Sequence, residues 1–508
     1  MSDSFVYEFL IKTDLKNEPI LEKRLKIAGI LYNTLLKEGF RRIKLLKQSK
    51  KYQLAIKTSK GKERQKLFIE SRKFYKFSDY ELQKFAIQTK NSCFIKDHLG
   101  SHICQKLATK AYLVLNRFLI NKGGKPRYKK LSQYSTVEGK SNKTAIRWKN
   151  KKAYWKNLEL DVIFDKKDKY GIQKHALLSK VKYCRIYKKN IKNKVKWFLQ
   201  LVLEGKPLIK EKNISTKKGS IGIDIGPSTI AVVGEKNAFL EPFCKELEPL
   251  HLKKKKLQRK ISRKLRLNNP ENFDKKNAVK KGAKNWLKSN RMKKDQQKIR
   301  EVFRKLKESR KRSHNKLANR ILKFGNHIKT EKLSFRAFQK MFGRSIGFRG
   351  PSSFLSKLKD KAENAGIKFD EFSTYKTYLS QICHNCLKRE KKPLSQRWHK
   401  CTCDIKPVQR DLYSAFLSRF VENNTLNIDQ AKKAWPGAHS LLEQAMLRLK
   451  QIASGKNYFA SFGLNEKLNQ RQSDSLVKDR SDLNKAKNVV RRNSESFGRF
   501  KSTAVRTP

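Results

Sequence analysis

The chain has 508 residues, with 122 Lys and Arg against 44 Asp and Glu, and its formal net charge is +78. Repulsion of that size requires a polyanionic partner, and nucleic acid is the first choice. A membrane surface is the alternative, but the sequence has no lipidation motif, no basic amphipathic anchor helix and no apolar run near the ~18 residues of a membrane span. No secretory signal is evident at the N-terminus. We therefore expect a cytoplasmic protein, nucleoid-associated in a prokaryotic cell.

The N-terminal part of the chain predicts strands on either side of a helical region. The run from Phe5 to Lys12 indicates a strand, and from Leu21 apolar residues recur at helical spacing. A second helix runs from Leu99 to Phe118 and ends at Asn121–Gly124. Residues 143–205 return to strand character, most clearly where apolar residues alternate from Val195 to Leu203. This order predicts one β module interrupted by a helical lobe.

After a polar boundary between Gly205 and Gly219, the chain predicts an α/β domain. Its expected elements, in order, are strands at 219–226 and 229–233, a highly basic helical stretch at 251–323, a strand ending at Glu331, a helix at 353–365, a strand at 367–372 and a helix opening at Asp411. Past Ser454 apolar residues become sparse, so residues 471–508 predict a mobile tail.

Three acids stand at the ends of separate elements of this α/β domain: Asp224, Glu331 and Asp411. Each alone has a simpler explanation: Asp224 could be exposed or neutralised by a cation, Glu331 could pair with Lys329, and Asp411 could cap its helix. Together they indicate a site for Mg²⁺ or Mn²⁺, because these hard cations prefer oxygen ligands. Two ions held by shared acids ~4 Å apart can cleave a phosphodiester.

Four cysteines are clustered within 21 positions, as Cys383-x2-Cys386 and Cys401-x-Cys403. Thiolates at such spacing are typical of a structural, tetrahedral Zn²⁺ site. The second pair is one residue shorter than the usual knuckle, so His384 or His399 could replace one cysteine as a ligand. The other four cysteines, at 93, 104, 184 and 244, are expected to be ordinary buried thiols.

Two basic segments have no matching acids or carry aromatic residues among the cations. The helices between Lys253 and Lys323 predict a phosphate-binding channel, although charged helical faces are usually just solvated. The stretch from Arg147 to Lys156 would suit base stacking with phosphate contact. Its aromatic residues are equally well explained as half-buried strand residues.

In order along the chain, these motifs resemble those of the TnpB family of transposon-encoded RNA-guided nucleases and of the related compact type V CRISPR effectors. Gly222-Ile-Asp-Ile-Gly resembles the first RuvC motif, Lys329-Thr-Glu-Lys-Leu the second, and Arg410-Asp-Leu-Tyr-Ser-Ala the third. Leu379-Ser-Gln-Ile-Cys-His-Asn-Cys resembles the start of the zinc ribbon, and Gly124-Lys-Pro-Arg-Tyr-Lys a basic turn of the family. The resemblance covers residues 1–425 or so.

The resemblance implies a multidomain α+β protein with a RuvC (RNase H-like) α/β nuclease domain, a zinc-ribbon insert, a split wedge β-barrel and a helical recognition lobe. The implied division is 1–18 wedge β segment, 19–125 recognition lobe, 126–216 wedge β-barrel, 217–378 RuvC domain, 379–405 zinc-ribbon insert that binds target nucleic acid, 406–425 final RuvC segment and 426–508 C-terminal extension, partly disordered.

By position in these motifs, Asp224, Glu331 and Asp411 would be the catalytic acids that bind Mg²⁺ or Mn²⁺, and Cys383, Cys386, Cys401 and Cys403 the zinc ligands. A guide RNA would occupy the basic surfaces and pair with double-stranded target DNA beside a short flanking motif. Because the segment from Cys403 to Asp411 is longer than in the family, Asp404 is kept as an alternative acid. The remaining alternatives are guide-dependent DNA binding or repression with little cleavage, and an RNase H-like transposase. The guide's origin, the flanking motif, the cleavage pattern and the number of copies per RNA stay open.

Overall fold

The computed structural model describes residues 3–192, 194–210, 218–280, 282, 285–393, 395–453 and 462–464. The chain forms two compact units, Met1–Leu208 and Ile209–Pro508. Each unit combines helices with sheets, in agreement with the predicted multidomain α+β class. The tail predicted at 471–508 lies outside the described residues. In the described part of the chain, no helix is both long and apolar enough to cross a membrane.

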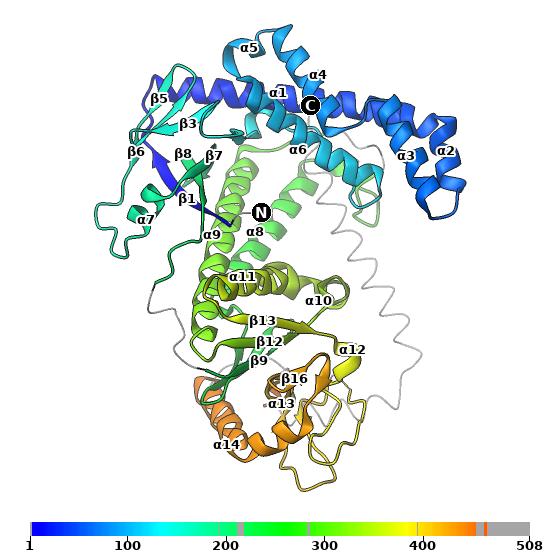
Figure 1. The fold of residues 1–508 in the computed structure, drawn as a ribbon, viewed down its shortest axis with the longest axis vertical. Coiled ribbons are helices and arrows are strands. Elements are labelled where there is room, and N and C mark those ends of the chain that lie inside the picture. The colour runs from blue at the N-terminus through cyan, green and yellow to red at the C-terminus, as the bar shows by residue number, and fades with distance from the viewer. Residues whose placement is uncertain are drawn as a thin grey trace. The chain divides into compact units, whose positions relative to one another are not determined.

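Six helices follow the first strand of the first unit (Figure 1). They are α1 (Asn17–Gln48), α2 (Lys50–Lys57), α3 (Lys62–Phe74), α4 (Asp79–Asn91), α5 (Ile95–His98) and α6 (Ser101–Leu119). The helical spacing that begins at Leu21 is confirmed, because Leu21, Leu25 and Ala28 are fully buried on one side of α1. Helix α6 ends at Leu119, two residues before the stop signal at Asn121.

The strands of the first unit form a five-stranded and a three-stranded sheet. They are β1 (Ser4–Ile11), β2 (Thr136–Glu138), β3 (Ile146–Lys149), β4 (Lys152–Trp155), β5 (Leu158–Leu160), β6 (Val162–Ile163), β7 (Val181–Ile191) and β8 (Lys194–Glu204). The larger sheet has the order β2-β7-β8-β1-β6, and the smaller one β3-β4-β5. Strand β1 pairs with β8, so the helices are inserted between two strands of one sheet, as predicted.

Two details of the first unit differ from the sequence-based expectation or decide between its alternatives. A helix that the sequence did not indicate, α7 (Ile172–Leu178), interrupts the strands. The aromatic residues of the Arg147–Lys156 stretch belong to the core: Trp155 is fully buried and Trp148 stacks on Phe9 at 5.4 Å. They are therefore strand residues and are not available for base stacking. Closure of the sheet into a wedge barrel stays a prediction.

The second unit is built on a mixed five-stranded sheet with the order β11-β10-β9-β12-β13 (Figure 1). Its strands are β9 (Ser220–Ile225), β10 (Thr229–Val233), β11 (Ala238–Pro242), β12 (His327–Glu331) and β13 (Lys368–Phe372). Strands β9, β10 and β11 are antiparallel neighbours, whereas β12 runs parallel to both β9 and β13. The strands predicted before Asp224, at Thr229, at Glu331 and at Ile367 are all confirmed.

The helices and short strands of the second unit follow or separate these strands. They are α8 (Glu248–Leu267), α9 (Asn290–Ile321), α10 (Phe335–Arg349), α11 (Pro351–Asn364), α12 (Thr374–Thr377), α13 (Arg410–Ser418) and α14 (Ile428–Ala453), with β14 (Trp398–His399), β15 (Val408–Gln409), β16 (Val421–Glu422) and β17 (Thr425–Leu426). The helices predicted at 353–365 and from Asp411 are confirmed, and α10 was not predicted.

The basic stretch predicted at 251–323 is two helices and not one continuous helical segment. Pro270 follows α8 closely, and proline cannot continue a helix because it lacks the N–H and clashes with the preceding turn. The Asn269 side chain then holds the connection by accepting a hydrogen bond from the Leu287 N–H at 2.5 Å and donating one to the Leu287 carbonyl at 3.0 Å.

Different helices cover the two faces of this sheet, which decides where side chains of β9 point. On one face Ile223 and Val232 belong to a core with α9 and α11 residues. On the other, Ala231 belongs to a core with residues of α13 and α14. Ala231 is the direct partner of Asp224 across β9 and β10, and directly paired residues lie on the same face. Asp224 therefore points to the α13 side of the sheet.

Candidate active site and metal centre

Asp224 and Glu331 lie on neighbouring parallel strands, near the carboxyl end of each. Strand β12 pairs with β9 in the register Thr330 to Ile223, so Glu331 is next to Asp224 one position further along. The pairing of Glu331 with Phe372 of β13 puts its side chain on the face where Phe372 joins the α13–α14 core. Because neighbouring strands are about 4.8 Å apart, the two carboxylates share one face and one edge of the sheet.

Helix α13 brings Asp411 to the same face. The closest approach is at Gly222, where an added Cβ would be 1.8 Å from the carbonyl oxygen of Ala415. Ala415 is one helical turn after Asp411, so both residues lie on the side of α13 that contacts β9. Asp224 is two residues after Gly222 and therefore on the same side of the strand. Gly222 has no side chain for this reason: the strand and helix that carry the two acids are in backbone contact.

The three acids influence one another electrostatically. The pKa of Asp224 is raised well above its ordinary value by burial and by the nearby charges of Asp411 and Glu331. Burial also raises the pKa of Asp411, and it raises the pKa of Glu331 from 4.5 to about 7. All three side chains keep part of their surface open to solvent. A partly open group of acids that repel each other is a site where a divalent cation would be stabilising.

Cations and an amide moderate the charge of Asp411. Arg410 and Arg397 lower the pKa of Asp411, and Arg410 also lowers the pKa of Asp224. The Arg410 Nε lies 3.8 Å from Asp411 Oδ1. The side chain of Gln409 accepts a hydrogen bond from the Leu412 N–H at 2.8 Å and so caps α13. The capping role considered for Asp411 is thus filled by Gln409, and the carboxylate remains available to the site.

The alternatives considered for the other acids are decided in the same way. Lys329 forms an ion pair with Glu422 at 3.8 Å, which is a different partner from Glu331. Asp404 is exposed, while Asp411 is the acid whose charge acts on Asp224. Among the described residues, however, the three carboxylates are not gathered tightly enough to surround one ion. Their donor type fits Mg²⁺ or Mn²⁺, and closer approach would come with binding.

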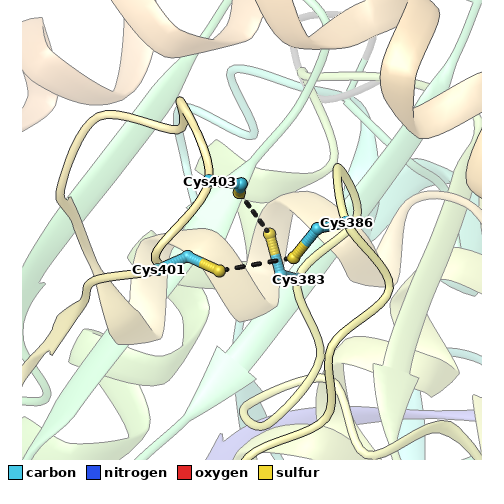
Figure 2. A group of neighbouring side chains, drawn as sticks. All are labelled: Cys383, Cys386, Cys401 and Cys403. Carbon is cyan, nitrogen blue, oxygen red and sulfur yellow. Dashed lines mark hydrogen bonds between the residues drawn. The ribbon is translucent and has the colours of Figure 1, made fainter.

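The four cysteines, by contrast, are assembled around one point (Figure 2). Their sulfur atoms all lie within 4.8 Å of one another, with Cys383 Sγ 3.6 Å from Cys403 Sγ and Cys386 Sγ 3.4 Å from Cys401 Sγ. Tetrahedral zinc with bonds of about 2.3 Å separates its sulfur ligands by about 3.8 Å, so the residues fit this ion. The N–H of Cys403 lowers the pKa of the Cys401 thiol to about 6, which favours the thiolate that a metal requires.

The two histidines considered as replacement ligands have other roles. The cysteine group contains neither of them. His384 Nδ1 is 2.8 Å from the Tyr413 hydroxyl, and His399 Nδ1 accepts a hydrogen bond from Lys392 Nζ at 2.6 Å. Both rings are buried, and burial lowers the pKa of each to about 4. The short Cys401-x-Cys403 spacing therefore does not prevent four cysteines from meeting.

The basic character of α8 is confirmed in its exposure, because the helix has no buried residue. It contacts α9 partly through Asp295, which pairs with Lys264 at 2.7 Å and Lys260 at 3.6 Å. Its remaining cations extend over the surface of the second unit. This arrangement is suited to a phosphate backbone, although the charge alone does not identify a channel.

One basic surface was not recognised as a site from the sequence. The segment 123–130, between α6 and β2, is held to α1 by Asn33, whose side chain accepts from the Lys129 N–H and donates to the Lys129 carbonyl, both at 2.8 Å. Tyr128 is 56% exposed on this segment. A cavity of about 220 Å³ beside it is lined by Arg117, Arg127 and Lys129 among others. An exposed ring among cations is the arrangement that binds single-stranded nucleic acid; the Gly-Gly-Lys-Pro signal marked only a turn.

Comparisons with known proteins place this chain beside two compact effector complexes. One solved structure, a Cas12f1–sgRNA–target DNA complex, is 14% identical, with a TM-score of 0.41, over 82% of this chain and 98% of that chain. Another, a CRISPR–Cas12f ternary complex, is 15% identical, with a TM-score of 0.26, over 82% of this chain and 99% of that chain. No family model and no curated protein matches. Because both TM-scores are low, membership in the TnpB family stays a prediction, and the function is inferred from the residues of this chain.

Proposed function

We propose that the chain is a guide-RNA-dependent endonuclease that cuts double-stranded DNA beside a short flanking motif. The observation that carries the proposal is the convergence of Asp224, Glu331 and Asp411 on one face of the second sheet, with the pKa of all three raised. Carboxylates with these features are typical of metal-dependent phosphodiester cleavage. The sheet, in which three antiparallel strands are followed by two parallel ones, supports the RuvC (RNase H-like) core that the motifs imply.

Each residue of the site has a defined part in the proposed reaction. Mg²⁺ or Mn²⁺, when bound, supplies a water of lowered pKa and neutralises the charge on the leaving oxygen. Asp224, Glu331 and Asp411 hold the ions in place and must be ionised to do so. Arg410 and Arg397, whose charges act on Asp411, lie on the side where the phosphodiester enters and neutralise part of its charge.

The remaining parts of the proposal concern the partners. The guide RNA occupies the basic surfaces, which include α8 and the segment 123–130, because +78 charges need a polyanion of matching size. The four cysteines hold a structural zinc ion, since a site with four protein ligands leaves no open position for catalysis. The wedge and recognition lobes correspond to the first unit, where the flanking motif would be read.

The test is to purify the full chain with the RNA that it retains, sequence that RNA, and supply double-stranded DNA that matches it. Cleavage that requires Mg²⁺ or Mn²⁺ and the matched sequence would support the proposal. Target binding without product at any concentration of either ion would instead favour the DNA-binding or repressor alternative. Strand joining at defined DNA ends in the absence of RNA would favour the transposase alternative.

A further inference from the structure

Tyr413 connects the carboxylate site to the cysteine site. It lies on α13, two residues after Asp411, and its side chain is fully buried. Positions two apart on a helix point to different sides, so α13 directs Asp411 toward β9 and Tyr413 toward the cysteine loops. The helix that carries a candidate catalytic acid is thus held between the sheet and the cysteine segment.

The Tyr413 hydroxyl is bound by the first cysteine pair. It accepts a hydrogen bond from the backbone N–H of His384 at 2.9 Å, and His384 Nδ1 is 2.8 Å away. His384 directly follows Cys383 and lies inside the Cys383–Cys386 turn. The histidine ring is 1% exposed, so these groups have no access to water as a replacement partner. Loss of the hydroxyl would leave a buried donor and a buried acceptor unsatisfied.

The Tyr413 ring is held by the second cysteine pair. His399, two residues before Cys401, stacks on it with ring centroids 4.3 Å apart. His399 also belongs to β14, which pairs with β15 directly before α13. At the start of the helix, the Arg410 N–H donates to the Arg397 carbonyl at 2.8 Å, and Arg410 Nη1 donates to the Pro393 carbonyl at 3.1 Å. Both halves of the cysteine segment therefore determine where α13 begins.

We propose that Tyr413 is a positioning residue that couples the two metal centres: an ion bound by the cysteines fixes His384 and His399, and through Tyr413 it fixes Asp411 at the carboxylate site. The coupling rests on the proposed function only in that the three acids bind a divalent cation. An ion on the cysteines then raises the affinity of the acids for their own ion, and binding at the acids stabilises the cysteine site in return, because coupling between two sites is reciprocal.

The experiment measures Mn²⁺ affinity by electron paramagnetic resonance, with the full chain as wild type, Cys401→Ser, Tyr413→Phe and the combination of both. Cys401→Ser weakens the cysteine site at a residue that is only half-buried. We expect each single change to weaken Mn²⁺ binding about tenfold, as is typical of groups that orient a metal ligand, and the combination to weaken it no further. Zinc content, measured on the same samples, is expected to fall in Cys401→Ser and to be retained in Tyr413→Phe. Unchanged Mn²⁺ affinity in Cys401→Ser, or effects that multiply in the combination, would overturn the coupling.

A matched pair of variants at His384 separates positioning from general stability. Asparagine presents an acceptor oxygen near the place of Nδ1, so His384→Asn is expected to restore Mn²⁺ affinity to within about threefold of the wild type, whereas His384→Ala loses about tenfold. Equal losses in both variants would contradict the proposal. Tyr134→Phe, which removes a hydroxyl from a buried tyrosine of the first unit, serves as control and leaves the affinity unchanged.

Asp224→Asn identifies which Mn²⁺ signal belongs to the acids. If wild type and Asp224→Asn bind Mn²⁺ equally, the carboxylate site itself is wrong and the proposed function fails. If Asp224→Asn abolishes a signal that Cys401→Ser and Tyr413→Phe leave untouched, the carboxylate site stands and the coupling is wrong.

Discussion

At the scale of single residues, the candidate site is a group of acids that the fold holds together against their own repulsion. The pKa of Asp224, Glu331 and Asp411 is raised in each case mainly by burial, with Arg410 lowering it at two of them. The metal-free protein therefore keeps protons on these acids at a pH where an exposed carboxyl has lost them. A bound cation would release those protons, so metal affinity should increase with pH.

The pH dependence of stability tests this charge arrangement. The pKa of Glu331 is raised from 4.5 to about 7, so between these values the folded state binds more protons than the unfolded state. The free energy of unfolding in magnesium-free buffer should therefore decrease as the pH rises through this window, by on the order of 2 kcal/mol for Glu331.

Glu331→Gln removes this proton and should make the decrease shallower, as measured by urea unfolding at pH 5, 6, 7 and 8. Addition of Mg²⁺ should recover stability in the wild type at pH 8 and less so in the variant. A wild-type stability that increases between pH 5 and 7 by more than that of the variant would show that the sign is wrong.

At the scale of elements, the site depends on one close approach between a strand and a helix. An added Cβ at Gly222 would be 1.8 Å from the backbone carbonyl of Ala415, and backbone cannot rotate away as a side chain can. Gly222→Ala should therefore displace α13 and with it Asp411. We expect a loss of about 3 kcal/mol of stability in the second unit, near the upper end for overpacked cores.

Thermal unfolding followed by circular dichroism would measure the effect of Gly222→Ala. Gly437→Ala is the matched control, since this glycine of α14 has no atom within 4 Å of the added Cβ and alanine is the better helix former. The control should unfold at the wild-type temperature or slightly above it. Equal behaviour of the two variants would mean that α13 does not pack on β9 as described.

The segment 123–130 carries a separate prediction about nucleic acid. Stacking of a base on Tyr128 contributes about 1–3 kcal/mol in comparable sites, so Tyr128→Ala should weaken binding of single-stranded RNA or DNA by about tenfold. Because Tyr128 is 56% exposed, the stability of the first unit should change little. Tyr80→Ala, at a tyrosine that is 73% exposed on α4, is the control. An equal loss of affinity in the control would show that Tyr128 has no special part.

These elements show which features sequence patterns could predict. Periodicity predicted α1, β8 and β12 because their buried residues recur at a fixed spacing along the chain. It could not predict the break after α8, where Asn269 and Pro270 override a continuous basic pattern, or α10 with its single strong stop at Gly350. The grouping of four cysteines was predictable from their spacing. The contact between Tyr413 and His384 was not, because it joins residues 29 positions apart through one hydroxyl.

At the scale of the whole molecule, charge determines how the protein meets its partner. With +78 formal charges, most binding energy is expected to come from release of counterions from phosphates. Affinity for nucleic acid should fall by about a thousandfold or more between 50 and 200 mM salt, as it does for proteins that make about six to ten phosphate contacts.

Variants of α8 test whether this helix is part of that surface. Lys253→Gln, Lys256→Gln and Arg259→Gln change exposed cations, and each should reduce the slope of log affinity against log salt by about one. Fluorescence anisotropy with the retained RNA would provide the slopes. Lys433→Gln on α14 is the control outside this helix, and an unchanged slope in all three α8 variants would remove α8 from the interface.

The central claim is that three carboxylates on one face of a sheet cut DNA with the help of divalent ions. The measurement that tests it most directly is single-turnover cleavage of matched double-stranded DNA by the RNA-loaded protein in Mg²⁺, compared between wild type and Asp224→Asn at equal target occupancy. We predict that the variant binds the target as the wild type does and cleaves it more than about a hundredfold more slowly, a larger loss than groups that only support a metal ligand produce. Cleavage by Asp224→Asn at the wild-type rate would contradict the account.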